Sequence, residues 1–403
     1  MNRLEEMYDK VLRQMDMEHE MEDEELLELI HVVLNEASEQ KYMPLQEKIH
    51  LSKELFNAFR KLDILQDLIE DEDITEIMVN GTDNIFLEKD GRVYPSDKHF
   101  LSVARLEDVI QQVVAGTNRY VNEASPIADA RLEDGSRVNV VLKPVALNGP
   151  IMTIRKFPRE KVTMEQLISW GSISAEAAEF LEVLVRAKYN IFVSGGTGAG
   201  KTTFLNALSD YIPKDERLIT IEDNAELQIK EVPNLVRLET RNVNLEGEGA
   251  VTIRDLIKAA LRMRPDRILV GEVRGEETVD MISSAMLNGH SGSMSTGHAN
   301  NPTDMLHRLE TMMMMGIDMP LAAIQRQIAS AIDIIIHLGR LRDKSRKVLE
   351  IAEVVGYEEG KVRTQTLYEF REEGTGNGEI QGKLMKVEEL VHREKLLAAG
   401  YTA

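Results

Sequence analysis

The chain has 403 residues, of which 43% are hydrophobic, so it is long and apolar enough for two or three domains with separate cores. The absence of cysteine excludes disulfides, thiolate metal sites and cysteine nucleophiles. A formal net charge of -21 argues against a nucleic-acid-binding protein, because such proteins need basic surfaces that displace counterions. No apolar stretch approaches the roughly 18 residues that span a bilayer. The acidic first residues also lack a secretory pattern, so a cytoplasmic protein is expected.

Residues 1–73 are predicted to form an acidic helical extension. Asp and Glu outnumber Lys and Arg by 21 to 8 over residues 1–75, which accounts for most of the negative excess of the chain. Apolar residues recur at helical spacing over Glu18–Val33, which predicts a helix with one apolar stripe and an acidic opposite face. Two interpretations are open: a solvated extension, or a docking helix for a partner protein.

The sequence pattern of residues 74–158 predicts a compact α+β domain. Short apolar runs alternate with turn signals such as Asn80-Gly81, which is typical of β-hairpins. The apolar spacing over Leu101–Gly116 predicts a helix. Strand and turn patterns then return as far as Phe157, and Pro158 marks the start of a polar linker.

Residues 159–189 are interpreted as linker helices, near Met164–Trp170 and Ala175–Lys188. Beyond Asn190 the pattern repeats strand, loop and helix, which indicates a mostly parallel sheet with helices on both faces. Strands buried on both faces are continuously apolar rather than alternating. The expected strands are Ile191–Val193, Leu218–Ile221, Ile268–Val270 and Ile332–Leu338.

A glycine-rich loop between a predicted strand, Asn190–Ser194, and a predicted helix, Thr203–Tyr211, matches the phosphate-binding pattern G-x-x-x-x-G-K-[ST] without mismatch. Glycines let backbone N–H groups turn toward phosphate oxygens, and the helix N-terminus adds positive potential. Lys201 is expected to bridge the β- and γ-phosphates and Thr202 to ligate Mg²⁺. The sequence therefore predicts ATP and Mg²⁺ as ligands. The predicted ATP-binding residues of the loop are Gly195, Gly196, Thr197, Gly198, Ala199, Gly200, Lys201, Thr202 and Thr203.

Two carboxylates at predicted strand ends are candidates for hydrolysis. Glu272 ends the apolar run Ile268–Val270 and is expected to hold Mg²⁺ through water or to polarise the attacking water. Glu222 follows Leu218–Ile221. The carboxyl ends of parallel strands lie at one edge of a sheet, so both acids are expected near the phosphate loop. For each, an ordinary surface acid is the alternative.

His290 and His298 lie on either side of a run of small residues that is expected to form a strand. Their spacing does not fit a helical zinc-ligand pair, and no thiolate is present to complete such a site. A neutral His298 at the strand end could contact the γ-phosphate or link it to a neighbouring subunit. A structural histidine remains equally open at this stage.

Taken together, these blocks resemble the CpaF/TadA-type ATPases of Flp pilus assembly, within the type II and type IV secretion ATPase superfamily. The likeness extends from about Ile74 to Gly356. Its main blocks are Gly195–Thr203 as Walker A, Thr220–Leu227 as Asp box, Leu261–Gly275 as Walker B and Gly289–Asn300 as His box. The smaller domain adds Ser125–Leu132, Asp134–Asn139 and Ile154–Phe157. Ser291 departs from the family pattern, which has a carboxylate there.

The resemblance implies an α/β fold: a RecA-like P-loop NTPase domain over 190–403 with a C-terminal extension, preceded by a smaller α+β, PAS-like domain. It also implies a homo-hexameric ring with nucleotide held between the two domains. Arg131, Arg137 and Arg155 are then expected to close over the phosphates. Arg237 and Arg241 are expected as arginine fingers in trans, since guanidinium groups offset charge on transferring phosphate. Exposed or ion-paired arginines are the alternative.

By this resemblance the chain is a hexameric ATPase motor. It is expected to act at the inner face of the cytoplasmic membrane with an inner-membrane platform protein, without nucleic acid, in pilus assembly or protein secretion. A pilus retraction motor of the same superfamily is an alternative. A RecA-like nucleic-acid motor is a second, which the acidic charge disfavours. A scaffold that binds ATP without turnover is a third.

Overall fold

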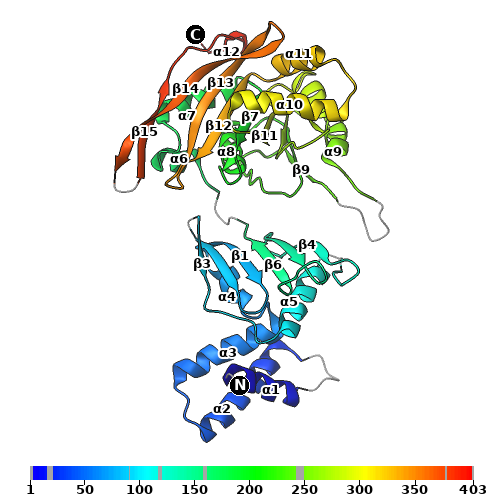
Figure 1. Cartoon of the computed structure of the whole chain (residues 1–403), viewed down its shortest axis with the longest axis vertical. Coiled ribbons are helices and arrows are strands. Elements are labelled where there is room, and N and C mark those ends of the chain that lie inside the picture. The colour runs from blue at the N-terminus through cyan, green and yellow to red at the C-terminus, as the bar shows by residue number, and fades with distance from the viewer. Residues whose placement is uncertain are drawn as a thin grey trace. The chain divides into compact units, whose positions relative to one another are not determined.

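The computed structural model describes residues 3–15, 21–89, 91–116, 120–157, 161–241, 249–376 and 379–401. The chain divides into two compact units, residues 1–159 (unit 1) and residues 160–403 (unit 2), whose elements are labelled in Figure 1. The predicted helix start at Glu18 and the predicted linker at Pro158 lie outside the described residues. None of the helices in the described ranges is long and apolar enough to cross a membrane.

Unit 1 begins with a three-helix bundle. A capping box formed by Glu22 and Glu25 starts α2 at Asp23, and the helix continues to Gln40. It is longer than predicted because Leu34 and Ala37, both buried, extend its apolar stripe. The helices of the bundle are α1 (Arg3–Gln14), α2 (Asp23–Gln40) and α3 (Leu45–Arg60). Their shared core contains Met7, Val11, Leu26, Ile30, Val33, Leu51 and Leu55.

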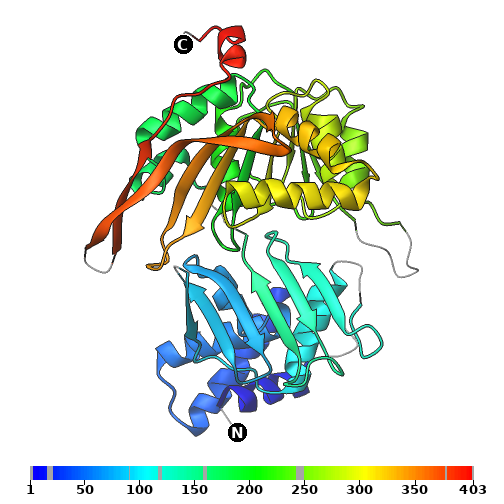
Figure 2. The same ribbon diagram turned by 45° about the horizontal axis from the view of Figure 1, so that its top comes forward.

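The rest of unit 1 is a six-stranded antiparallel sheet with the order β3-β2-β1-β6-β5-β4, whose strands run side by side in Figure 2. Alternate residues such as Val138, Val140 and Ile154 are buried in a core shared with α4 and α5. The helices are α4 (Leu65–Glu70) and α5 (Val103–Ala115). The strands are β1 (Ile74–Asn80), β2 (Ile85–Lys89), β3 (Arg92–Pro95), β4 (Ile127–Arg131), β5 (Arg137–Val141) and β6 (Ile151–Arg155).

Unit 2 is built on a nine-stranded sheet with the order β15-β14-β13-β12-β7-β11-β10-β8-β9. The strands from β12 to β9 in that order are parallel, as their registers show. This confirms the α/β fold class that the apolar runs predicted. The parallel strands are β7 (Ile191–Gly195), β8 (Leu218–Glu222), β9 (Leu235–Glu239), β10 (Arg267–Val270), β11 (Met294–His298) and β12 (Ile334–Arg340).

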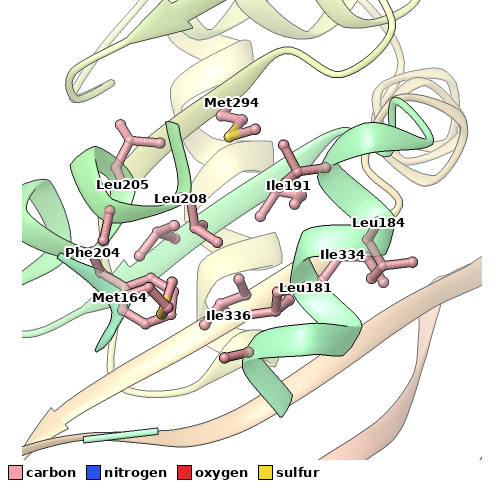
Figure 3. Packing of buried hydrophobic residues seen from close by; sticks show 14 of the residues in the cluster. Met164, Leu181, Leu184, Ile191, Phe204, Leu205, Leu208, Met294, Ile334 and Ile336 are labelled. Carbon is pink, nitrogen blue, oxygen red and sulfur yellow. The ribbon is translucent and has the colours of Figure 1, made fainter. Parts of the chain in front are cut away.

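Helices cover both faces of this sheet. Ile191 and Val193 of β7 point into one core, while Phe192 points into the other, so the strand is apolar throughout. Figure 3 shows the first core, where Leu181 and Phe204 pack on the sheet. This face carries α6 (Met164–Ser169), α7 (Ala175–Arg186), α8 (Lys201–Leu208) and a 3₁₀ turn (Ser209–Tyr211). The other carries α9 (Ile253–Ala260), a π-helix (Asp280–Met286), α10 (Pro302–Gly316) and α11 (Leu321–Ala331).

Three antiparallel strands extend the sheet beyond β12, and the sequence pattern had not indicated them. They are β13 (Arg346–Glu358), β14 (Lys361–Gly376) and β15 (Glu379–Lys386), followed by α12 (Glu394–Ala398). The buried carboxylate of Glu353 accepts hydrogen bonds from the backbone N–H groups of Val391 and His392. The hydroxyl of Tyr189 donates to the carbonyl of His392. These contacts hold the C-terminal segment against unit 2.

Candidate active site

The glycine-rich loop connects the end of β7 to the start of α8, as predicted. Gly198 and Gly200 have φ values of 71° and 91°, in the left-handed region that glycine adopts without strain. A side chain at Gly195 would place its Cβ 2.5 Å from the carbonyl oxygen of Leu338, on the neighbouring strand β12. Within the described ranges, no acceptor takes up the N–H groups of Gly198 or Gly200. The loop therefore presents free backbone donors at a helix N-terminus, as an anion site requires.

Lys201, the first residue of α8, is only 8% exposed. Its Nζ donates to the carbonyl of Gly196 at 3.2 Å and lies 3.2 Å from Nδ1 of His298. Burial lowers the pKa of this ammonium group, and Glu272 opposes that shift. The positive charge of Lys201 thus faces the loop and contacts only neutral groups, the Gly196 carbonyl and the His298 ring. A phosphate group could replace these contacts.

Glu272 follows β10 and lies next to His298, the last residue of the adjacent strand β11. Nε2 of His298 is 2.9 Å from Oε1 of Glu272, an ion-pair distance without hydrogen-bond geometry, so Oε1 has no hydrogen-bond partner. Oε2 accepts from Nη2 of Arg274 at 2.7 Å. His298 therefore lies between the lysine of the loop and the carboxylate of Glu272.

The pKa of His298 is lowered, chiefly by burial and further by the charge of Lys201, although Glu272 acts in the opposite direction. We conclude that the imidazole is neutral near physiological pH. A neutral ring can accept a hydrogen bond from Lys201 through Nδ1, which leaves its proton on Nε2.

Glu222 ends β8, next to β10, and is 3% exposed. Its Oε1 accepts the backbone N–H groups of Glu226 and Leu227, both at 2.9 Å, while its Oε2 has no partner. Burial raises its pKa to about 7, and the two N–H groups and Arg237 limit the rise. A carboxyl group with such a pKa is suited to proton transfer near neutral pH.

Replacing Glu222 by Gln is expected to make the protein more stable at about pH 8, by about 1–3 kcal/mol, because a raised pKa means that the folded state binds the proton more tightly. The wild-type free energy of unfolding should therefore fall as pH rises from about 4.5, the unfolded value, to about 7. Urea denaturation of both proteins across this range measures the difference. Equal pH dependence in the two proteins would show that Glu222 is ionised throughout.

The oxygen donors of the site fit Mg²⁺, a hard cation that takes one or two carboxylates together with phosphate and water. Glu222 and Glu272 each have one buried oxygen without a hydrogen-bond partner. The half-buried Thr202 follows Lys201 in the first turn of α8, where its hydroxyl could ligate the ion. No group of three or more His, Asp and Glu residues in the described ranges forms a metal site without phosphate.

His290 lies apart from this site. It precedes β11, whereas His298 ends it, so the two histidines lie at opposite edges of the sheet. Nδ1 of His290 is 2.9 Å from the carbonyl oxygen of Pro265, in the turn that leads into β10. His290 therefore supports the structure of the sheet, and the departure at Ser291 does not touch the phosphate loop.

The arginines predicted to bind phosphate fall in two groups. Arg131, Arg137 and Arg155 lie directly opposite one another on β4, β5 and β6 of unit 1, so they form one row on one face of that sheet. Arg237 and Arg241 belong to unit 2. Arg237 on the edge strand β9 donates to the carbonyl of Leu227, and Arg241 donates to the carbonyl of Gly249.

Two further arginines at the loop were missed in the sequence. Nε of Arg346 on β13 donates to the carbonyl of Gly198 at 2.8 Å. Arg340 pairs with Arg346 in the β12–β13 register, and its Nη1 is 3.9 Å from the place of a Cβ on Gly198. The pairing of β12 with β7 brings Arg340 to the loop, and the pairing of β13 with β12 brings Arg346 there, so no local motif could have identified them.

The family model described as "Type II/IV secretion system protein" matches residues 59–399. A Mycobacterium tuberculosis protein whose name refers to conjugal transfer is 35% identical over 311 residues, which is 76% of this chain and 87% of that protein. The type IV secretion system protein VirB11 of Brucella abortus is 32% identical over 309 residues, covering 69% of this chain and 84% of VirB11.

A crystal structure of the pilus retraction motor PilT with bound ADP superimposes with a TM-score of 0.53 at 22% identity. The match covers 76% of this chain and 81% of PilT, and it shows a shared fold. The family match spans both the phosphate loop and the strand ends near Glu222, Glu272 and His298. The chain belongs to the type II/IV secretion system protein family.

Proposed function

We propose that this protein is an ATPase that drives a pilus or secretion machine. The observation that carries the proposal is the contact series from Lys201 through His298 to Glu272, at the end of the phosphate loop. A loop alone would suffice for binding nucleotide. Hydrolysis needs, in addition, carboxylates close enough to orient water, and the ends of β8 and β10 carry two of them.

The chemistry can be assigned residue by residue. The N–H groups of the loop and the Lys201 ammonium would bind the β- and γ-phosphates, and Thr202 and Glu272 would hold Mg²⁺, Glu272 through water. The bound ion would offset charge on the phosphate oxygens. Glu272 or Glu222 orients the attacking water and accepts its proton, and the neutral His298 senses whether phosphate occupies the loop.

The assembly proposed here is a homo-hexamer of the CpaF/TadA type that powers Flp pilus assembly through an inner-membrane platform protein. The sequence blocks and the membership of the secretion family support it. In such a ring Arg131, Arg137 and Arg155 would close over the nucleotide of their own subunit. Arg237 on the exposed edge strand β9, with Arg241 just beyond it, would serve a neighbouring subunit as arginine fingers.

If the site needs residues from two subunits, the specific ATPase activity is expected to rise steeply with protein concentration. Activity should be proportional to the assembled fraction, measured in parallel by analytical ultracentrifugation under the same buffer conditions. Arg237→Ala should lower the activity of the assembled protein without dispersing it. A monomer with full specific activity would contradict the ring.

The cellular role is tested by purification of the tagged full chain from its native host. The proposal expects a pilus or secretion platform protein of the inner membrane to be retained. Stimulation of phosphate release by DNA or RNA would instead favour a nucleic-acid motor, against the acidic charge of the chain.

A further inference from the structure

The direction of the Gly198 carbonyl decides whether the glycine-rich loop can hold phosphate. Such a loop binds its anion through N–H groups that face inward, and a carbonyl oxygen turned toward the same place would repel the anion. Gly198 and Gly200 have φ values of 71° and 91°, and glycine leaves such conformations as easily as it enters them. The loop sequence therefore permits the binding form without imposing it.

A side chain from outside the loop holds this carbonyl. Nε of Arg346 donates to the carbonyl oxygen of Gly198 at 2.8 Å, and no second donor among the described residues reaches that oxygen. Because the peptide group is planar and trans, the contact also turns the N–H of Ala199 to the opposite side. That N–H donates across the loop to the carbonyl of Gly196 at 3.3 Å. The peptide group between Gly198 and Ala199 is thus fixed in one orientation by two hydrogen bonds.

The turn that precedes Arg346, between β12 and β13, is itself braced. Asp343 accepts hydrogen bonds from the N–H and the hydroxyl of Ser345 and from the N–H of Ile380 on β15. The hydrogen bond from the Ser345 hydroxyl contributes most to lowering the pKa of Asp343 to about 2, so this carboxylate stays charged at neutral pH. The N–H of Leu341 closes the turn on the carbonyl of Ser345 at 2.8 Å. The position of Arg346 is therefore set by the fold and not by the loop.

The start of β13 is also anchored to a second segment. The N–H of Val348 donates to the carbonyl of Ser172, between α6 and α7, at 2.8 Å. The Cδ atom of Arg346 lies 3.5 Å from the place of a Cβ on Gly200, which is van der Waals distance. The aliphatic stem of the arginine therefore lies against the loop, and its backbone has little freedom to withdraw.

Two roles fit an arginine at this place. Its Nη groups could bind phosphate directly, or its Nε could keep the loop in shape. The contact in the structure favours the second role, because Nε is bonded to a carbonyl that must stay clear of the phosphate. No carboxylate in the described parts of the chain lies within ion-pair distance of the Arg346 guanidinium. An ordinary surface ion pair therefore does not account for its place.

We propose that Arg346 is a positioning residue of the phosphate loop. Its hydrogen bond keeps the Gly198 carbonyl turned outward before nucleotide arrives, so that the N–H groups of the loop already face the place of the β-phosphate. If only a fraction of the molecules held the loop in this form, the apparent affinity for nucleotide would fall by that fraction. The inference rests on the proposed binding of ATP by the loop, which binding by the wild type tests separately.

Two variants of similar size separate this role from a charge contact with phosphate. In Arg346→Gln the side-chain N–H group takes the place of Nε, so the donor stays and the charge is lost, whereas Arg346→Met loses both. Titration of the full chain with fluorescent analogues of Mg·ADP and Mg·ATP measures the affinities. Arg346→Met should bind both nucleotides about tenfold more weakly, and Arg346→Gln should stay within about threefold of wild type. The turnover number at saturating ATP should stay within about twofold in both variants, because bound nucleotide imposes the same form on the loop.

Arg342→Ala is the matched control, because Arg342 belongs to the same turn but pairs with Glu372 on β14. Its affinity for nucleotide should stay within about twofold of wild type, since exposed ion pairs contribute little. Both arginines are exposed, so urea denaturation should give the same stability for all of these proteins.

Wild-type affinity in Arg346→Met would overturn the proposal. Equally weak binding by Arg346→Gln and Arg346→Met, or a larger loss for ATP than for ADP, would overturn it in favour of a charge contact with phosphate. A similar loss in Arg342→Ala would assign the effect to the turn as a whole and not to the hydrogen bond of Arg346. A wild-type chain that bound neither nucleotide would contradict the proposed function itself.

Discussion

Replacing Glu272 by Gln is expected to lower the rate of ATP hydrolysis about 100-fold or more while ATP binding persists. Gln keeps the shape of the side chain but cannot accept a proton or attract the metal, and a positioned base contributes about 10²–10⁴-fold. The loop donors and Lys201 remain in place, so nucleotide should accumulate on the protein. Steady-state phosphate release and binding of a fluorescent ATP analogue measure the two effects in one preparation.

Glu276→Gln is the matched control for this variant. Glu276 lies four residues further on, where its half-exposed side chain pairs with Arg254. Its substitution should leave hydrolysis within about twofold of wild type, because exposed ion pairs contribute little. Near-normal hydrolysis in Glu272→Gln would mean that another residue is the general base, and Glu222 is the next candidate. No hydrolysis in the wild type would favour a scaffold that binds ATP without turnover.

Replacing Lys201 by Ala is expected to weaken ATP binding about 100-fold or more and to abolish hydrolysis. The ammonium is held by the Gly196 carbonyl and by His298, which are weaker partners than the phosphates that would replace them. Its pKa is lowered by burial, so the nucleotide-free protein bears the cost of a desolvated charge. The apo variant should therefore unfold at the same or a higher temperature than wild type.

Thermal melts with and without Mg·ATP separate loss of binding from loss of fold. Mg·ATP should raise the melting temperature of the wild type. Lys201→Ala should have a wild-type melting temperature or a higher one without nucleotide, and Mg·ATP should not raise it further. Lys214→Ala is the control, since this exposed lysine pairs with Glu231 away from the loop. Retained tight ATP binding in Lys201→Ala would refute the assignment of the phosphate loop.

The parallel strands of unit 2 could be predicted because each of them is recognisable from its own residues. Ile191–Val193 and Ile268–Val270 are apolar at every position, which reports burial on both faces directly. The positive φ angles at Gly198 and Gly200 require glycine, so the sequence motif identified the loop directly. Its predicted position between a strand and a helix is the one observed between β7 and α8. Strand ends then placed Glu222 and Glu272 at one edge of the sheet by topology alone.

The antiparallel extension could not be predicted in the same way. β13 and β14 are long strands in which charged residues such as Glu350 and Glu369, paired across the two strands, interrupt the apolar runs. Their sequences therefore lack the continuous apolar pattern of the parallel strands. Their place is set by pairing with β12, a contact between segments that no local pattern encodes. For the same reason Arg346, which reaches the loop only through this pairing, was not identified.

The positions of the two histidines relative to the phosphate loop also needed the structure. His290 precedes β11 and His298 ends it. Their spacing in the sequence did not show whether either one lies near the phosphate loop. The register of β11 beside β7 places His298 level with Gly195, while the turn before β10 binds His290. The raised pKa of Glu222 could not be predicted either, because it depends on how deeply the folded chain buries this carboxyl group.

A crystal structure of the full chain with Mg²⁺ and a non-hydrolysable ATP analogue tests the central claim most directly. We expect the β-phosphate against the N–H groups of Gly198 and Gly200, and Lys201 moved from the Gly196 carbonyl to the phosphates. Glu222 and Glu272 should face the metal and the γ-phosphate. Nucleotide bound elsewhere, with Lys201 still on Gly196 and His298 at saturating ligand, would contradict the account.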